Sequence, residues 1–224
     1  MTSRIRAFES IPLLAQLTPA ERSLIRSWTN EQNYGAREIV FRDDMPFSGL
    51  HILKSGNIKL CKTCGGKEQI LELLGPGDVI DLIPLFDGGM HAVTAKTMTV
   101  CSVYHFSPAD AQRLIATYPP ILNALLNLTS LRLRKLAELA NDLAFKNVSA
   151  RVCNVLLTQA NSVDSPNKQL CLERPLTRQE LASMVGTARE VAWRALKKLE
   201  RDGLIEIHGQ TINILDAVAL AART

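Results

Sequence analysis

The 224-residue sequence predicts an α+β fold with a strand-rich N-terminal half and a helical C-terminal half. Between about residues 36 and 106, short β-branched segments alternate with glycine-containing turns. From Ser107 onward, apolar residues recur at helical spacing, and near the C-terminus two helical segments flank a glycine. The composition, 46% hydrophobic and 21% charged, allows two modest domains. No apolar run reaches the ~20 residues of a membrane span.

Residues 8–33 predict short helices ahead of the strands. Thr18 is placed as an N-cap, with Pro19 at the first helical position and Glu21 at the third. The strand-rich part that follows is typical of an antiparallel barrel or sandwich. Its turns are Ser55-Gly56-Asn57, Gly65-Gly66, Gly75-Pro76-Gly77 and Asp87-Gly88-Gly89.

A long helix is predicted from about Pro119 to Phe145, because apolar residues recur there at alternating spacings of four and three. These residues are Leu122, Leu126, Thr129, Leu133, Leu136, Ala140 and Leu143. Such a heptad seam predicts a coiled coil with a second copy of the chain. The alternative is a helix that packs on its own barrel. The extra leucines that would serve that purpose are Leu125, Leu128, Leu131 and Leu139.

After a helix near residues 149–160 and a polar loop at residues 161–169, the C-terminal segment contains a helical pair. Thr177 caps the first helix, and Glu180 completes a capping box. Gly186 permits a tight turn, and a second helix starts at Thr187 or Ala188. Two alternating segments around a His-Gly-Gln turn then predict a β-hairpin wing.

Helix, glycine turn and helix form the architecture of a helix-turn-helix that reads DNA. From Arg174 to Arg201 the chain has seven basic and three acidic residues, which suits a polyanionic partner. Arg189, Glu190 and Arg194 lie on the outer side of the second helix and are the candidate base-reading residues. The candidate phosphate contacts are Thr177, Arg178, Thr187, Ala188 and His208.

The chain resembles the bacterial CRP/FNR superfamily over almost its whole length. The motifs that carry this resemblance are L-x-P-G-D, L-F-D-G-G, N-D-L-A-F-K-N and T-R-Q-E-L-A…V-G…R-E…R. The resemblance implies a cyclic-nucleotide-binding-type β-roll, or jelly roll, in residues 1–118. A dimerisation helix in residues 119–145 and a winged helix-turn-helix in residues 146–224 would follow.

The resemblance also implies a homodimeric transcription regulator with RNA polymerase as a partner. Arg189, Glu190 and Arg194 occupy the base-reading positions of the cyclic AMP branch. Double-stranded DNA with pseudo-palindromic, TGTGA-like half-sites is therefore the implied target. Trp193 departs from this branch, in which the corresponding position is small.

The contacts to a cyclic nucleotide are missing. The family binds the ribose through the Glu of G-E-L and the cyclic phosphate through the Arg of R-S or R-T. Here Leu82 replaces the Glu, and Gly89-Met90 stand in place of the Arg. Leu136-Ala137 replace the Thr-Ser pair that meets adenine. A phosphate charge left unpaired in a closed pocket is costly, so the sequence argues against cyclic AMP.

Other cofactors stay open. An iron–sulfur cluster of the fumarate-nitrate regulator type is not expected, because that branch of the family binds it through N-terminal cysteines and no cysteine precedes Cys61. An apolar effector pocket is a candidate site for a small molecule or haem, and its expected residues are Leu82, Ile83, Leu85 and Met90. The candidate haem ligands are His51, His91 and His105.

Cys61 and Cys64 form a C-x-x-C just before Gly65-Gly66. Three interpretations are open: a metal knuckle, a redox pair or a β-hairpin tip. A closed zinc site needs four ligands, and the sequence has no second C-x-x-C, so no metal site is expected. The hairpin tip is favoured by the glycines. A reversible Cys61–Cys64 disulfide stays as an alternative.

These observations predict a cytoplasmic DNA-binding regulator. Five irregularly spaced cysteines do not form a secreted disulfide framework, and no signal peptide is read at the N-terminus. No Ser-His-Asp set, phosphate loop or paired acids indicate an enzyme. The β-roll would sense a small molecule, a haem-bound gas or a redox change, and would reposition the DNA-binding domains through a hinge at Phe145, Lys146 and Asn147. A redox- or metal-sensing regulator acting through Cys61 and Cys64 is the alternative.

Overall fold

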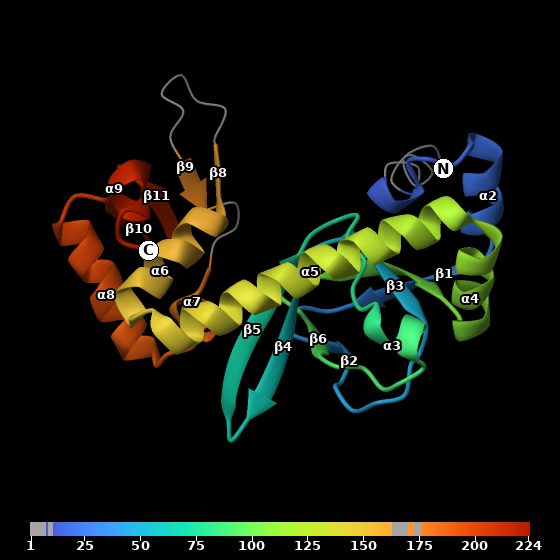
Figure 1. Cartoon of the computed structure of the whole chain (residues 1–224), viewed down its shortest axis with the longest axis horizontal. Coiled ribbons are helices and arrows are strands. Elements are labelled where there is room, and N and C mark those ends of the chain that lie inside the picture. Colours follow the sequence, from blue (N-terminus) through green and yellow to red (C-terminus); the bar gives the residue numbers. More distant parts are fainter. Residues whose placement is uncertain (1–7, 9–10, 163–169, 173–175) are drawn as a thin grey trace. The chain divides into compact units, whose positions relative to one another are not determined.

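The computed structural model describes residue 8 and residues 11–162, 170–172 and 176–224. Contacts divide the chain into two compact units, which are described separately. The first unit consists of Met1–Lys62 and Leu71–Lys135, and the second of Thr63–Ile70 and Leu136–Thr224. Figure 1 labels the elements along the chain. The predicted α+β class, with a β-roll, a long helix and a helix-turn-helix, is confirmed.

Two antiparallel sheets form the β-roll. One sheet has the strand order β1-β7-β3, and the other has the order β2-β6-β4-β5. The bounds of the first sheet's strands are β1 Thr29–Tyr34, β3 Leu50–Ser55 and β7 Cys101–Phe106. Those of the second are β2 Ile39–Phe41, β4 Ile58–Cys64, β5 Lys67–Leu74 and β6 Thr94–Thr97. The predicted turn at Gly65-Gly66 therefore joins β4 to β5, where both glycines have positive φ.

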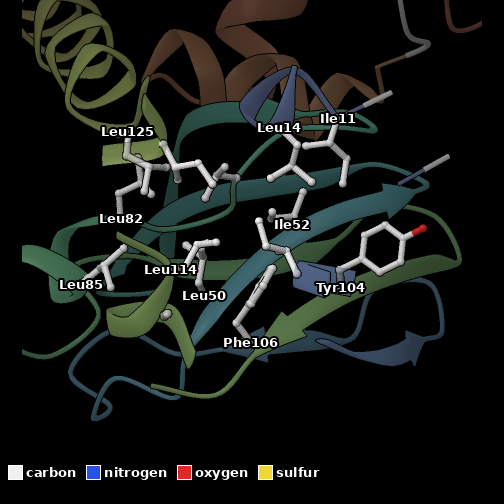
Figure 2. Close-up of a cluster of buried hydrophobic side chains, with 14 of the residues drawn as sticks. Ile11, Leu14, Leu50, Ile52, Leu82, Leu85, Tyr104, Phe106, Leu114 and Leu125 are labelled. Atoms are coloured by element: carbon white, nitrogen blue, oxygen red, sulfur yellow. The ribbon is translucent and has the colours of Figure 1, made fainter. Parts of the chain in front are cut away.

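Short helices flank the sheets and add side chains to the core. They are η1 Pro12–Leu14, α2 Pro19–Arg26, α3 Ile83–Asp87 and α4 Pro108–Thr117. The capping box predicted for Thr18 and Glu21 is present at the start of α2. Leu14 and Leu114 from these helices meet Leu50 and Phe106 from the first sheet in one buried cluster (Figure 2).

The helix α5, Pro119–Phe145, has 27 residues and spans the range predicted for the dimerisation helix. Its first turns contribute Ile121 and Leu125 to the buried cluster of the β-roll, at 1% and 0% exposure. Arg132 further along α5 pairs with Glu72 at 2.7 Å and donates to the carbonyl oxygen of Val79. One face of α5 is thus bound to the β-roll by packing and by charge.

The second unit is a small helical domain with a four-stranded sheet (Figure 1). Its helices are α6 Val148–Thr158, α7 Arg178–Val185, α8 Arg189–Arg201 and α9 Ala217–Ala221. The sheet has the order β10-β11-β9-β8, with β8 Ala160–Ser162, β9 Leu170–Leu172, β10 Ile205–His208 and β11 Thr211–Ile214. The predicted polar loop at 161–169 is only partly tested, because residues 163–169 lie outside the described residues and β8 already includes 161 and 162.

The glycines at the ends of α7 and α8 give a matched pair of variants. Gly186 and Gly203 have φ values of 71° and 72°, in the left-handed region that costs other residues about 1–2 kcal/mol. A Cβ on Gly203 would meet no atom within 4 Å in the described chain, whereas one on Gly186 would lie 2.6 Å from Leu143 Cδ2. We therefore expect Gly186→Ala to lower the free energy of unfolding more than Gly203→Ala, by the small added cost of turning the flexible end of the Leu143 side chain away. Equal losses in urea unfolding would contradict this.

Candidate DNA-binding surface and sensing core

The N-terminus of α7 is held by the predicted capping box. The Thr177 hydroxyl accepts from the Glu180 N–H at 3.2 Å, and the Thr177 N–H donates to the Glu180 carboxylate at 2.8 Å. Gly186 ends the helix in the left-handed conformation and donates its N–H to Ala182 O. The Thr187 N–H donates to the same carbonyl at 3.1 Å. These bonds fix the short turn from which α8 leaves.

The helix α8 begins at Arg189 with Ala188 as its N-cap, and no side chain caps it. Its first N–H groups therefore have no side-chain acceptor, and they lie at the positive end of the helix dipole. Both features suit a phosphate oxygen. Thr187 and Ala188, predicted as phosphate contacts, thus stand at a helix start that is open to an anion.

The inner face of α8 is buried and the outer face is open. Ala192, Leu196 and Leu199 are at most 2% exposed, whereas Arg189 and Glu190 have side-chain exposures of 60% and 71%. Arg194 is also exposed. The three candidate base-reading residues therefore all reach solvent.

Two of these residues, Arg189 and Glu190, bind each other. The guanidinium of Arg189 donates to Glu190 Oε1 at 3.0 and 3.1 Å. Exposed ion pairs of this kind contribute only about 0–1 kcal/mol, so base edges can replace this one at little cost. The pair holds the two side chains side by side at the start of α8.

The predicted wing is present as the antiparallel pair β10–β11, with His208 opposite Thr211 at its tip. The His208 side chain is 61% exposed and lies 3.0 Å from the Glu206 carboxylate. The imidazole is therefore accessible on the wing.

The connection between α5 and α6 contains two polar anchors that the sequence did not reveal. The first is Asp142, which is only 7% exposed, pairs with Lys146 and accepts from the Asn154 amide. The second is Arg151 in α6, which donates to Lys146 O and to Val185 O, both at 2.8 Å. Its acceptors are main-chain carbonyls, which any sequence supplies, so no motif marks the contact.

Among the predicted hinge residues, Phe145 ends α5 with 84% exposure. Asn147 caps α6 by accepting from the Ala150 N–H at 3.0 Å. The Lys146 side chain binds Asp142 and its carbonyl accepts from Arg151. The predicted hinge thus lies at the break between α5 and α6, and hydrogen bonds and an ion pair hold the residues on both sides of this break.

Much of the predicted seam of α5 is exposed in the single chain. Leu126, Leu133, Leu136 and Leu143 have exposures of 46%, 67%, 41% and 40%. Ala140 is also exposed, and Leu122 and Thr129 are partly buried. The neighbouring stripe of α5 supplies Leu125 and Leu128 to the β-roll cluster, as the sequence allowed. Leu131 does not join them, because it is 58% exposed.

The predicted effector residues do not share one face. Leu82 and Leu85 are each 2% exposed and belong to the buried cluster in Figure 2. Ile83 and Met90 are 41% and 58% exposed. Leu82, the N-cap of α3, and Leu85 are three residues apart and share the buried side of this short helix, whereas Ile83 lies on its outer side and Met90 follows the helix. The expectation of one apolar pocket lined by all four residues is therefore not supported.

The three candidate haem ligands are engaged within the β-roll. His91 is 1% exposed, its Nδ1 lies 2.8 Å from the Asp81 carboxylate, and its ring stacks on Phe41 with centroids 3.8 Å apart. His51 is 3% exposed and lies against His105, with ring centroids 4.7 Å apart.

The Nε2 atom of His105 lies 2.8 Å from Ser48 O. Burial, together with the neighbouring His105 and His91, lowers the pKa of His51 to about 3. His51 is therefore neutral at pH 7.

The two cysteines of the C-x-x-C lie on one strand, β4, with Cys61 buried and Cys64 exposed. The Cys61 thiol points to Thr94 O at 3.7 Å. Residues three apart in an extended strand face opposite sides and are about 10 Å apart at their Cα atoms, whereas a disulfide needs less than about 7 Å. The disulfide alternative would require the end of β4 to change conformation.

Within the described residues, no group of three or more His, Cys, Asp or Glu side chains is placed to hold a metal ion. In the same residues, no single helix is both long and apolar enough to cross a membrane. The bent pair α4 and α5 meets these criteria only when the two helices are combined.

Two family models match the chain. A cyclic nucleotide-binding domain matches residues 31–118, and a Crp-like helix-turn-helix domain matches residues 150–223. These segments contain the β-roll strands from β2 onward and the α6–α9 domain. The two models therefore agree with the two parts of the fold.

Curated relatives extend the match. The "cAMP-activated global transcriptional regulator CRP" of Salmonella typhimurium is 35% identical over 163 residues, or 72% of this chain and 78% of the relative. A "CRP-like cAMP-activated global transcriptional regulator" of Mycobacterium tuberculosis is 31% identical over 186 residues, or 82% of this chain and 83% of the relative. The chain belongs to the CRP/FNR superfamily of transcription regulators. Its relatives are DNA-binding regulators and not enzymes.

Solved structures show the same fold. The c-di-GMP responsive global regulator CLP of Xanthomonas campestris is 29% identical, with a TM-score of 0.74 over 89% of this chain and 100% of that chain. FixK2 of Bradyrhizobium japonicum is 21% identical, with a TM-score of 0.76 over 87% and 96% of the two chains. The chain is thus a DNA-binding transcription regulator of the CRP/FNR type with a sensing domain.

The buried His51 predicts acid sensitivity of the β-roll. Its folded pKa of about 3 is below the ordinary 6.5, so the unfolded chain takes up the proton first as the pH falls. The contribution of the neutral, buried His51 to the free energy of unfolding is complete above pH 6.5 and is lost as the pH falls toward 3. Between pH 7 and 5, the wild type should lose about 2 kcal/mol more stability than His51→Phe.

Urea unfolding followed through Trp28 in a Trp193→Phe background measures this difference. His208→Phe, at an exposed wing position, is the control and should keep the wild-type pH dependence. Identical slopes for wild type and His51→Phe would contradict the burial of a neutral imidazole.

Proposed function

We propose that the chain is a dimeric, sequence-specific regulator that reads pseudo-palindromic DNA through α8. The observation that carries this proposal is the open row of Arg189, Glu190 and Arg194 on a helix whose opposite face is buried. An arginine donates two bonds to guanine O6 and N7, and a glutamate accepts from cytosine N4. The proposed half-site is therefore TGTGA-like.

Phosphate contacts would orient α8 in the major groove. Thr177 and Arg178 start α7, Thr187 and Ala188 precede α8, and His208 is exposed at the tip of the wing. These groups come from three segments around α8, which supports a footprint along the DNA backbone. RNA polymerase is the proposed protein partner, and the cytoplasm is the proposed location, as for regulators of this family.

Removal of the Arg189 side chain tests whether α8 reads DNA bases. Arg189→Ala should weaken binding to a TGTGA-type palindrome by about 1–3 kcal/mol per half-site and relax the preference at one base pair. A gel shift with the matched duplex and with single-base variants measures both effects. Arg201→Ala is a suitable control, because Arg201 lies in the last turn of α8. Unchanged affinity and unchanged base preference in Arg189→Ala would refute its role.

The proposed dimer forms along the exposed seam of α5. Its four exposed leucines recur at heptad spacing on a stripe beside the one that carries Ile121 and Leu125, which pack on the β-roll. Two copies related by a two-fold axis would place their α8 helices in successive major grooves, about one helical turn apart.

A charge placed on the seam should separate the two copies. Leu133→Glu, at 67% exposure, is expected to yield a monomer, because a carboxylate would have to be buried between the helices. Leu131→Glu is the matched control, since Leu131 has similar exposure, 58%, but lies off the seam. Light scattering after size exclusion measures the mass. A dimer that survives Leu133→Glu, or that both variants abolish equally, would contradict the seam.

The signal is proposed to be different from cyclic AMP. Leu82 stands at the family's ribose-binding position and is part of the hydrophobic core. The nearby pair of His91 and Asp81 is buried as well, so these two polar side chains bind each other inside the β-roll. A small molecule, a haem-bound gas or a redox change are the signals considered, and a signal would act on the DNA-binding domains through the α5–α6 hinge. A titration in which cyclic AMP tightens DNA binding would contradict this proposal.

Haem fits the described residues poorly. The ring nitrogens of His91 and His105 already face Asp81 and Ser48, and His51 is buried among aromatic and histidine rings. Redox sensing through Cys61 and Cys64 needs a movement of β4, as their placement shows. A small molecule is the third signal considered, and it requires neither a free histidine nor a movement of β4. The visible spectrum and free-thiol content of the purified protein would separate the three.

A further inference from the structure

Trp193 is a large residue of α8 that does not enter the core. It is half-buried, whereas Ala192, Leu196 and Leu199 fill the inner face. Trp193 follows Arg189 by four residues, so its side chain lies on the same stripe of α8, one turn further along. The indole is therefore a neighbour of the proposed base-reading residues and not a part of the domain core.

The indole contacts a cation from the other helix of the motif. The guanidinium carbon of Arg178 lies 3.6 Å from the centroid of the Trp193 ring. The ammonium of Lys197, one turn further along α8, lies 4.9 Å from the same centroid. Arg178 is the first residue of α7, next to the N-cap Thr177. The stack therefore fixes Arg178 at the positive end of α7.

The positively charged side chains on the outer sides of α7 and α8 differ in their binding partners. Arg189 is paired with Glu190 and Lys197 with Glu200, so their charges are balanced by carboxylates. Among the described residues, no carboxylate forms an ion pair with Arg178. Within the part of the chain that the structure describes, its side chain is held by the aromatic face, and no carboxylate there balances its positive charge.

Stacking suits an arginine that binds phosphate. The guanidinium contacts the ring through its flat face, while its N–H donors point outward in its plane and stay free for oxygen acceptors. A flexible arginine loses rotamer freedom when it binds, whereas a stacked one has lost much of it beforehand. The Arg178 guanidinium is therefore already oriented and still positively charged, and both properties favour binding of an anion at this position.

We propose that Trp193 is a positioning residue that holds Arg178 for contact with a DNA phosphate, and does not itself read a base. The proposal rests on the DNA-binding function proposed above. It accounts for a bulky residue where the cyclic AMP branch has a small one, because the indole joins the outer sides of α7 and α8.

A double-mutant cycle tests the coupling on the full chain. DNA affinity is measured by fluorescence anisotropy at several salt concentrations for the wild type, R178A, W193L, W193F and R178A/W193L. The duplex is the TGTGA-type palindrome or, if the wild type prefers another, the palindrome selected from random duplexes. R113A is the matched control, because Arg113 stacks on Trp28 at 4.1 Å in the first unit.

R178A should weaken binding about tenfold and reduce the salt slope by about 2 for the dimer, one phosphate in each half-site. In the W193L background, R178A should weaken DNA binding by less than about threefold, because Arg178 is no longer held in place there. W193F keeps an aromatic face and should stay within about threefold of the wild type, whereas W193L should not. R113A should bind as the wild type does.

Three results would overturn the proposal. Additive effects of R178A and W193L would show no coupling, and equal binding by W193F and W193L would show that no aromatic face is needed. A changed base preference in W193F would assign Trp193 to base reading. If the wild type binds no duplex at all, the DNA-binding function fails, and this positioning role fails with it.

Discussion

The burial of one face of α8 is the interaction on which the DNA-reading surface depends. Ala192, Leu196 and Leu199 pack inward with at most 2% exposure, so the remaining side of the helix is fixed in orientation. Gly186 adds the second constraint, because its left-handed conformation sets the turn between α7 and α8. Because of these two constraints, Arg189 is exposed and Trp193 is half-buried in a defined geometry, and the proposed contacts to bases and phosphates follow from them.

A similar division of faces governs α5. Ile121 and Leu125 fill the β-roll core, whereas the leucines of the seam stay open. Burial of one apolar stripe leaves the second without a partner in the single chain, and a second copy would provide one. At the end of α5, the buried Asp142 and the carbonyl-binding Arg151 connect the helix to the DNA-binding domain. These polar contacts join the end of α5 to α6, and α6 to α7, within the second unit.

Patterns along the sequence predicted those features that depend on local chemistry. Capping boxes, glycine turns and the seam of α5 are set by neighbouring residues, and the structure contains the boxes at Thr18 and Thr177 as expected. Contacts between distant residues were not predictable. Asp81 with His91 and Arg178 with Trp193 are examples, because no spacing rule links them. The four expected effector residues failed to share one face for the same reason, since the direction of each side chain depends on packing around α3.

Selection of binding sites from random duplex DNA tests most directly whether α8 reads DNA as one half of a symmetric pair. We expect enriched sites with two-fold symmetry and half-sites about 10 base pairs apart, each resembling TGTGA. The same selection with Arg189→Ala should keep the spacing and lose the preference at one base pair of each half-site. Enrichment of sites without symmetry, or no enrichment at all, would show that α8 does not read DNA in this way.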